Sequence, residues 1–104
     1  MPAKKKAVLP SESEIPQDLD MERRVLGRMI VAPATDIPAA RAILRAEDFF
    51  SLTHGLIFAA LLELYDAAGA ESIDAGSLAA ALRQKGMLDE LGGPAYIGTL
   101  IDAA

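Results

Sequence analysis

The sequence predicts an all-α fold, a compact bundle of four main helices plus one or two short helical turns. Apolar residues make up 52% of the 104 residues and aromatic residues only 5%, a balance that suits packed helices better than sheets. The apolar residues recur three and four positions apart, and no segment shows the sustained alternation of a strand. Capping residues, glycines and prolines divide this pattern into separate helices.

Residues 1–16 are expected to form a flexible N-terminal arm in front of a helical head domain at residues 17–104. The lysines of the arm, Lys4, Lys5 and Lys6, either keep the chain soluble or contact phosphate or a partner protein. The net charge is −5, and the head domain alone carries −6 because the arm holds three lysines and two glutamates. A domain that binds duplex DNA by itself usually presents a basic stripe, so we expect weak or no DNA binding.

The first helix is predicted from Leu19 to about Val31, with Asp18 as its N-cap and Pro33 ending it. Gly27 stands in the middle of this helix, where glycine costs about 1 kcal/mol relative to alanine. Such a glycine predicts that another backbone approaches closely at that point.

Glu22 falls on the apolar side of the same helix, between Leu26 and Met29. A partly buried carboxylate needs hydrogen-bonding partners. We therefore predict that Glu22 binds the backbone at a helix end, His54 or an arginine.

A second, shorter helix is predicted to begin near Asp36, with Pro38 in its first turn. Its buried stripe is expected to consist of Ile37, Ala40, Ile43 and Leu44. Residues 46–50 then form a connector that turns the rings of Phe49 and Phe50 inward.

The longest helix is predicted to open at Ser51 or Leu52 and to end at Ala68, with Gly69 as its C-cap. Apolar side chains cover most of its circumference, so it is expected to be the central helix of the bundle. Its exposed strip is expected to consist of Ala59, Glu63 and Asp66.

His54 is the only histidine, and it lies on the same face of the central helix as Leu61 and Tyr65. The expected role is structural, with the ring nitrogens satisfied by backbone groups or a carboxylate, rather than catalytic.

The next helix is predicted to begin with Asp74 as its N-cap, with Ile73 and Leu78 spaced as a hydrophobic staple. Gly86 ends this helix at the C′ position, and residues 87–91 form one short helical turn.

Gly92 and Gly93 then break the chain, and the last helix is predicted from Pro94 to about Asp102. It is expected to bury Tyr96, Ile97, Leu100 and Ile101.

The sequence lacks the residue patterns that common catalytic and binding chemistries require. It has no phosphate-cradling G-x-x-x-x-G-K-[ST] loop, no cysteine and a single histidine, which excludes an ATPase site and a metal site of the His/Cys kind. Its carboxylates form no recognisable acid–base pair. We therefore predict no catalytic, cofactor-binding or metal-binding residues, no cofactor and no small-molecule ligand.

The dispersed aromatic residues are expected to be core rather than a base-stacking platform, because no basic residues flank them. They are Phe49, Phe50, Tyr65 and Tyr96. Part of Phe50 or Tyr96 is expected to stay exposed for a protein partner. The candidate partner contacts are Glu63 and Asp66 on the central helix and Tyr96 on the last one.

The location expected from the sequence is cytoplasmic. The chain has no cysteine, and its longest apolar run, residues 56–62, is shorter than the roughly 20 residues that cross a bilayer. The N-terminal residues do not form the apolar stretch of a signal peptide.

Three groups of residues occur in the order and at the intervals of a known family. The first matches P-x-[SD]-x-x-x-E-x-x-[VL]-L-G through Pro16, Asp18, Glu22, Val25, Leu26 and Gly27. The second matches D-F-[YF]-x-x-x-H-x-x-I-F through Asp48, Phe49, Phe50, His54, Ile57 and Phe58. The third consists of Ile73, Asp74, Leu78, Leu82, Gly86, Leu88, Gly92, Gly93, Tyr96 and Ile97. Together they resemble the N-terminal domain of DnaB-type replicative DNA helicases over roughly residues 16–102.

The resemblance implies a non-catalytic helical head of a ring-shaped hexamer. A separate domain of that family uses ATP and Mg²⁺ to move along single-stranded DNA and unwind the duplex. The heads form a collar, help to assemble the ring, and contact the primase and sometimes a helicase loader. The implied partners are therefore primase, a helicase loader and other helicase subunits, in the replisome at the bacterial nucleoid. The structural-motif residues are Glu22, Gly27, Asp48, Phe49, His54, Phe58, Asp74, Gly93 and Tyr96.

The sequence departs from the family after Ala104, where a helical hairpin, a linker and the ATPase domain normally follow. The chain is therefore either an excised domain or a free-standing homologue, and a monomer is expected, with a dimer as the alternative. A free-standing homologue would act as a helicase-binding regulator or decoy, an idea that fails if the reading frame continues into a Walker A motif.

Two other small helical domains compete with this interpretation. The helicase-binding domain at the end of a primase has a similar fold, but the D-F-[YF] and G-G-x-x-Y-I motifs favour the helicase. An acyl-carrier protein requires Asp-Ser-Leu at a helix start, whereas Asp74 here is separated from Ser77 and Leu78.

Overall fold

The computed structural model describes the backbone from Ile15 to Ala104 and the side chains from Leu19 onward. Lys4, Lys5 and Lys6, and nearly all of the predicted arm, lie outside the described residues. Five α-helices and two short 3₁₀ helices make up the described part, which contains no strand, and the predicted all-α fold is confirmed. The α-helices are α1 (Ile15–Val31), α2 (Pro33–Ile43), α3 (Leu52–Ala68), α4 (Ala75–Gln84) and α5 (Pro94–Ala103); the 3₁₀ helices are η2 (Ala46–Asp48) and η3 (Ala70–Ser72).

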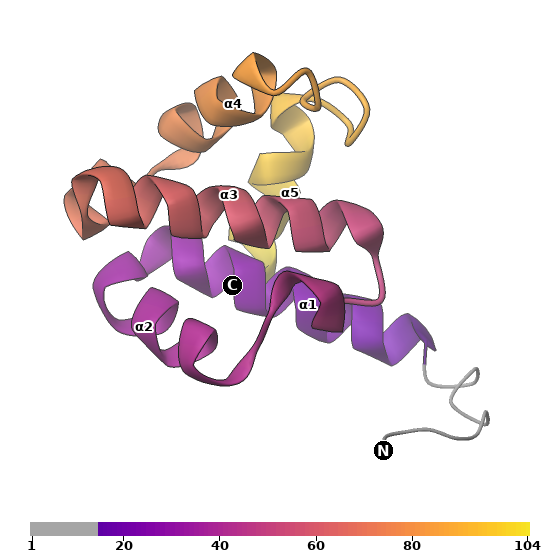
Figure 1. Ribbon diagram of the computed structural model, residues 1–104. Coiled ribbons are helices and arrows are strands. Elements are labelled where there is room, and N and C mark those ends of the chain that lie inside the picture. Colours follow the sequence, from indigo (N-terminus) through magenta and orange to yellow (C-terminus); the bar gives the residue numbers. More distant parts are fainter. Residues whose placement is uncertain (1–14) are drawn as a thin grey trace.

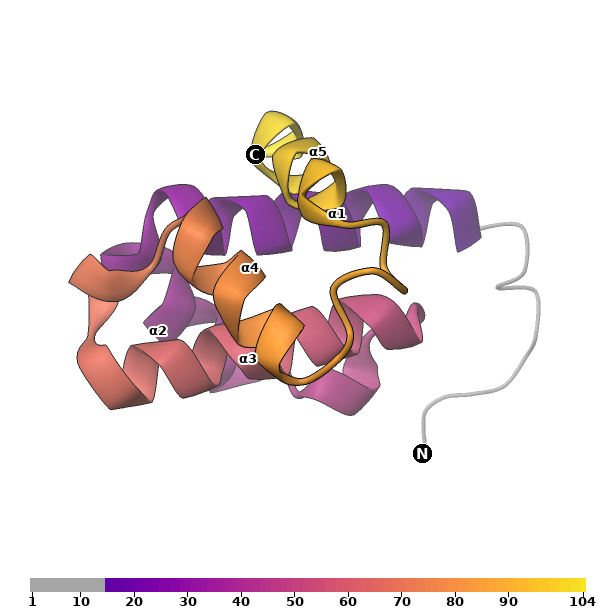
Figure 2. The same cartoon turned by 90° about the horizontal axis from the view of Figure 1, so that it is seen from above.

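Helices α1 and α3 lie side by side and run in the same direction, while α4 packs on α3 and α5 crosses α1 (Figures 1 and 2). Helix α2 and the η2 connector close the remaining side of this pair (Figure 1). The core between the helices is continuous. It consists of Leu26, Met29, Ile30, Ile37, Ala40, Ile57, Phe58, Ala60, Leu61, Ile73, Leu78, Ala79, Leu82, Leu88, Ile97 and Leu100.

Helix α1 begins four residues earlier than predicted, at Ile15 rather than Leu19. Asp18 therefore lies inside the helix, and its assignment as the N-cap is wrong. Pro16 is the second residue of the helix. A backbone N–H at that position has no intrahelical partner, so proline costs no hydrogen bond there. The helix ends at Val31, as predicted.

Helix α2 also begins earlier than predicted, at Pro33 rather than near Asp36. Pro33 both ends α1 and occupies the first position of α2, since proline is favoured there. Pro38 consequently lies inside the helix rather than in its first turn, and its ring is exposed.

The predicted buried stripe of α2 is wrong at one position. Ile37 and Ala40 are buried, but Ile43 is 79% exposed. The helix ends at Ile43, and Leu44 adopts an extended conformation that packs its side chain against the core. At about 100° per residue, Ile43 lies about 120° around the helix from Ile37 and so points away from the buried stripe.

Helix α3 has the predicted ends and the predicted central place. The hydroxyl of Ser51 accepts the backbone N–H of His54 at 3.2 Å, and Gly69 closes the C-terminus with a φ of +84°. The helix contacts α1, α2 and α4 as well as both 3₁₀ helices, so most of its circumference is covered.

Helix α4 and the chain that follows also match the prediction. Ile73 and Leu78 are both buried beside the Asp74 cap, as a hydrophobic staple requires. Gly86 has a φ of +73°, and the N–H of Met87 donates to the carbonyl of Leu82 at 2.9 Å, which completes the C-terminal cap. Residues 87–91 form the predicted single turn, in which the N–H of Leu91 donates to the carbonyl of Met87 at 3.3 Å.

Gly27 lies where α1 and α5 cross, and it is buried. A Cβ atom built there would overlap the carbonyl oxygen of Leu100 and lie 3.1 Å from the backbone nitrogen of Ala104. Only a residue without a Cβ atom allows the two backbones to come this close. The predicted close approach at Gly27 is therefore confirmed, and α5 is the helix that makes it.

Candidate functional site

A chain of polar side chains links three helices through the interior. The Oε1 atom of Glu22 on α1 lies 2.7 Å from the Nδ1 of His54 on α3, and the Nε2 of His54 lies 2.5 Å from the hydroxyl of Tyr96 on α5. The side chain of His54 is 2% exposed and that of Glu22 is 12% exposed. The predicted partnering of Glu22 is confirmed. One ring nitrogen of His54 meets a carboxylate, as predicted, while the other meets the hydroxyl of Tyr96, a partner that the sequence analysis did not name.

Glu22 also caps the N-terminus of α3 from outside that helix. Its Oε2 accepts the backbone N–H of Phe50 at 2.5 Å, and its Oε1 accepts that of Ser51 at 3.3 Å. These amides precede the first turn of α3, where backbone donors lack intrahelical partners. Of the three partners predicted for Glu22, it therefore binds two, the backbone at a helix end and His54.

The acceptor role of Glu22 fixes the hydrogen bonds of His54. The Nδ1 must carry a proton to donate to the carboxylate, so in the neutral ring the Nε2 accepts from the hydroxyl of Tyr96. Among the described residues, no buried side-chain nitrogen or oxygen lacks a hydrogen-bond partner. Because His54 is enclosed and both of its nitrogens are used, this arrangement orients helices rather than presenting a base to a substrate.

The residues of the D-F-F run take three different positions. The carboxylate of Asp48 accepts the backbone N–H of Arg45 at 2.8 Å and so stabilises η2. The ring of Phe49 packs on that of Phe58 with a centroid distance of 5.1 Å. Phe50 is 60% exposed, so the prediction that both connector rings turn inward is wrong for Phe50.

Asp74 caps α4 as predicted, since its Oδ1 accepts the backbone N–H of Ser77 at 2.7 Å. This hydrogen bond to the backbone of Ser77 lowers the pKa of Asp74. Gly93 precedes α5 with a φ of +71°, in the left-handed region that favours glycine. These two motif residues therefore shape helix starts.

The predicted partner contacts Glu63 and Asp66 lie exposed on α3, but both are engaged within the chain. Glu63 pairs with Lys85 at 2.8 Å. Asp66 accepts two hydrogen bonds from Arg41, at 2.8 and 3.0 Å, and these bonds lower the pKa of Asp66. Tyr96, the third candidate, is half-buried and bound to His54. The three do not form one patch.

Among the side chains from Leu19 to Ala104, no three histidine, cysteine, aspartate or glutamate residues gather as a metal site would require. Over the same residues, no helix combines the length and the apolar character needed to span a bilayer.

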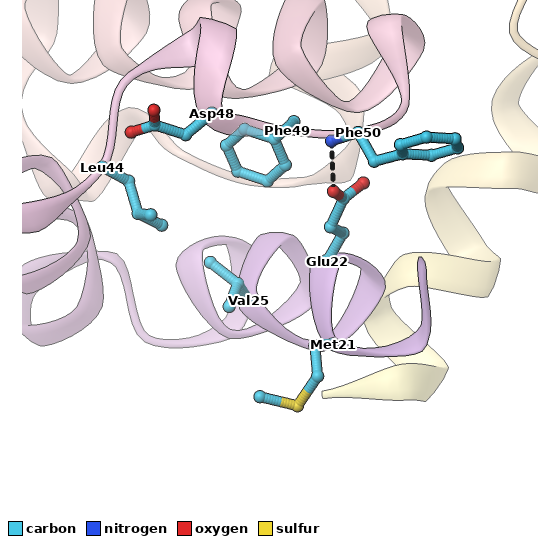
Figure 3. Close-up of a pocket in the computed structure, with 7 residues that line it drawn as sticks. All are labelled: Met21, Glu22, Val25, Leu44, Asp48, Phe49 and Phe50. Atoms are coloured by element: carbon cyan, nitrogen blue, oxygen red, sulfur yellow. Dashed lines mark hydrogen bonds between the residues drawn. The ribbon is translucent and has the colours of Figure 1, made fainter. Parts of the chain in front are cut away.

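An open hollow of about 350 Å³ separates α1 from the connector between α2 and α3. Val25 of α1 and Leu44 of the connector face each other across it, and Phe49 lies above them (Figure 3). Glu22, Asp48, Met21 and Phe50 complete its lining. The lining is therefore mainly apolar, with carboxylates at its edge.

Sequence reasoning missed several exposed apolar side chains, of which Met21 lines this hollow and Leu52 lies outside its lining. Met21 is 59% exposed, and Leu52, in the first turn of α3, is 79% exposed. The sequence analysis placed neither of these two side chains, because residue type and spacing do not reveal how many helices surround a given face. Exposed apolar side chains indicate a protein-binding surface where they lie together, as Met21 and Phe50 do in the lining of this hollow.

The family comparison places nearly the whole described chain in one domain. The family described as DnaB-like helicase N-terminal domain matches residues 14–104. The chain is 38% identical over 93 residues to the replicative DNA helicase DnaB of Geobacillus stearothermophilus, covering 89% of this chain and 20% of that protein. It is 39% identical over 98 residues to the DnaB of Mycobacterium leprae, covering 91% of this chain and 16% of that protein. The chain thus spans about a fifth of the length of these relatives.

A solved structure has the same fold. The crystal structure of the N-terminal domain of DnaB helicase from Mycobacterium tuberculosis superposes with a TM-score of 0.79 at 36% identity. The match covers 86% of this chain and 60% of that one. The family match and the shared fold therefore lead to one conclusion: the chain belongs to the DnaB-like helicase N-terminal domain family.

Proposed function

We propose that this domain serves the assembly of a replicative helicase ring and the contacts of that ring with primase and a helicase loader. The observation that carries the proposal is the match of residues 14–104 to the N-terminal domain of replicative helicases. In this role the domain is bound by other proteins and performs no reaction itself. The ATP-dependent unwinding, with its ATP and Mg²⁺, would belong to a different domain of the parent protein.

The charge and surface of the domain support a protein-binding role. The chain carries a net charge of −5, so its field repels the phosphate backbone of DNA. Large apolar side chains, among them Met21, Ile43, Phe50 and Leu52, remain exposed. Binding to other cytoplasmic replication proteins would remove this apolar surface from water.

A titration of the 104-residue chain with the primase and with the intact helicase of its own organism tests the proposal. At low salt we expect saturable binding to at least one of them, and weak or no binding to a duplex or single-stranded oligonucleotide. No binding to either protein would contradict the proposed function.

A further inference from the structure

Two hollows lie along α1 and share part of their lining. A second hollow of about 310 Å³ lies between α1 and α2, and Val25 and Leu44 line both. The two hollows together form what we call the α1 groove. Met29, a buried core residue, contributes to its lining, and Ile43 stands at its edge with 79% of its surface exposed.

One face of α1 forms the length of this groove. Met21, Arg24, Val25 and Arg28 line it, at the spacing i, i+3, i+4 and i+7. Helices present such faces to other helices. The seven steps from Met21 to Arg28 advance about 10 Å along the axis at about 1.5 Å per residue. The α1 groove therefore has the length of about two helical turns.

The two ends of the α1 groove differ in charge. Asp48 and Glu22 lie at the end beside Met21; Asp20, close by in the sequence, pairs with Arg23 and is not part of the lining. Arg24 and Arg28 lie toward the other end. Arg28 binds Asp36 at 2.9 Å, whereas Arg24 forms no ion pair with a described residue. The positive N-terminal end of a helix is attracted to carboxylates and the negative C-terminal end to arginines.

We propose that the α1 groove receives an amphipathic helix of two to three turns from a partner protein. The helix runs parallel to α1, with basic residues near its N-terminal end and acidic residues near its C-terminal end. This inference rests on the proposed function and adds to it the surface and the chemistry of the partner. A second copy of the chain, or residues 1–14 of the same chain, are the other occupants that the test must distinguish.

The methionine methyl groups of the full 104-residue chain provide the measurement. Met21 lies at one end of the α1 groove, Met29 lines its other half, and Met87 lies outside it. The probe is a stapled helical peptide of three turns with one apolar stripe, basic N-terminal residues and acidic C-terminal residues. In a titration followed by methyl NMR, we expect saturable shifts at Met21 and Met29 and none at Met87.

The orientation is tested with a nitroxide on either end of the peptide. An N-terminal label should broaden the Met21 signal more than the Met29 signal, and a C-terminal label should do the reverse. A peptide of the same composition with its apolar stripe scrambled should not bind. Equal binding of the scrambled peptide, no saturable shift or the opposite broadening would overturn the proposal.

Paired variants locate the binding surface. Met21→Glu should weaken peptide binding at least about tenfold by placing a charge on the apolar face, while Leu52→Glu, at an exposed position outside the groove lining, should leave the Kd unchanged. Arg24→Glu should weaken it about fivefold, and Arg83→Glu, an equal charge change on α4, should not. Equal effects within either pair would overturn the proposal.

The remaining outcomes separate this inference from the proposed function. If the chain binds primase or helicase but Met21→Glu and Leu52→Glu bind equally well, the α1 groove is the wrong surface and the proposed function stands. If the unaltered chain binds neither protein, the proposed function itself fails.

Shifts of Met21 and Met29 with protein concentration alone would assign the groove to a second copy. If deletion of residues 1–14 shifts the Met21 and Met29 signals, the α1 groove is occupied by the N-terminal residues of its own chain. Either result would overturn the proposal.

Discussion

The carboxylate of Glu22 lies 2.7 Å from the Nδ1 of His54 and also accepts the two backbone amides that precede α3. One side chain of α1 thus sets the start of the central helix and the orientation of a buried ring. The hydroxyl of Tyr96 extends this link to α5.

Replacing Glu22 by glutamine should destabilise the domain by about 2 to 3 kcal/mol. Both oxygens of the carboxylate accept hydrogen bonds, whereas an amide has one accepting oxygen and an NH₂ group that only donates, so it cannot serve all three donors. Glu71→Gln is the matched control, because Glu71 is exposed and forms no hydrogen bond with a described side chain. Urea unfolding of both variants measures the difference. Equal free energies of unfolding would show that Glu22 does not hold the helices together.

Tyr96→Phe should cost about 1 to 2 kcal/mol, because it leaves the buried Nε2 of His54 without its partner. Tyr65→Phe should change the free energy of unfolding by less than about 0.5 kcal/mol, since Tyr65 makes no side-chain hydrogen bond with the described residues. Thermal unfolding of the two variants tests this contrast, and a larger loss in Tyr65→Phe would contradict it.

Gly27→Ala should destabilise the domain by about 1 to 3 kcal/mol, although alanine is the better helix former, because its methyl group would separate α1 from α5. Gly98→Ala, within α5, should instead stabilise it by up to about 1 kcal/mol, since a Cβ atom there meets no atom within 4 Å. Calorimetry of the two variants measures whether each substitution lowers or raises the stability of the domain. A stabilising Gly27→Ala would disprove the close crossing.

Asp74 should make stability depend on pH in the acid range. Its pKa is lowered from 3.8 in the folded state by the hydrogen bond from Ser77, so the stabilisation is complete well above 3.8. It is lost as the pH falls through the lower, folded pKa. Asp74→Asn keeps the cap but removes this dependence, so its melting temperature should approach that of the wild type on acidification. Asp89→Asn, whose side chain makes no hydrogen bond with described residues, is the control. A difference in melting temperature between Asp74→Asn and the wild type that does not narrow as the pH falls would contradict the assignment of this pH dependence to Asp74.

The features of the fold that depend on residues close together in the sequence could be predicted. The caps at Ser51, Asp74 and Gly86 follow from local backbone geometry, and Gly27 inside α1 indicated a close crossing before the partner helix was known. The helix starts were less predictable, because Pro16 and Pro33 are compatible with either the end of one helix or the first turn of the next.

The features that depend on distant residues were only partly predictable. Phe49 and Phe50 follow one another in an extended segment, where successive side chains point to opposite sides, so only one ring can enter the core. That Glu22 meets both the start of α3 and His54 depends on how α1 and α3 pack side by side. The α1 groove is formed by segments about twenty residues apart, so the periodicity of neither one reveals it.

The most direct test of the account is a competition experiment. The 104-residue chain is added in molar excess to a priming reaction that contains the intact helicase and primase of its organism. If the domain works by being bound by replication proteins, primer synthesis should fall as the concentration of added chain rises, whereas an irreversibly unfolded sample of the same chain should have no effect. Primer synthesis unaffected by any excess of the folded chain would contradict the account.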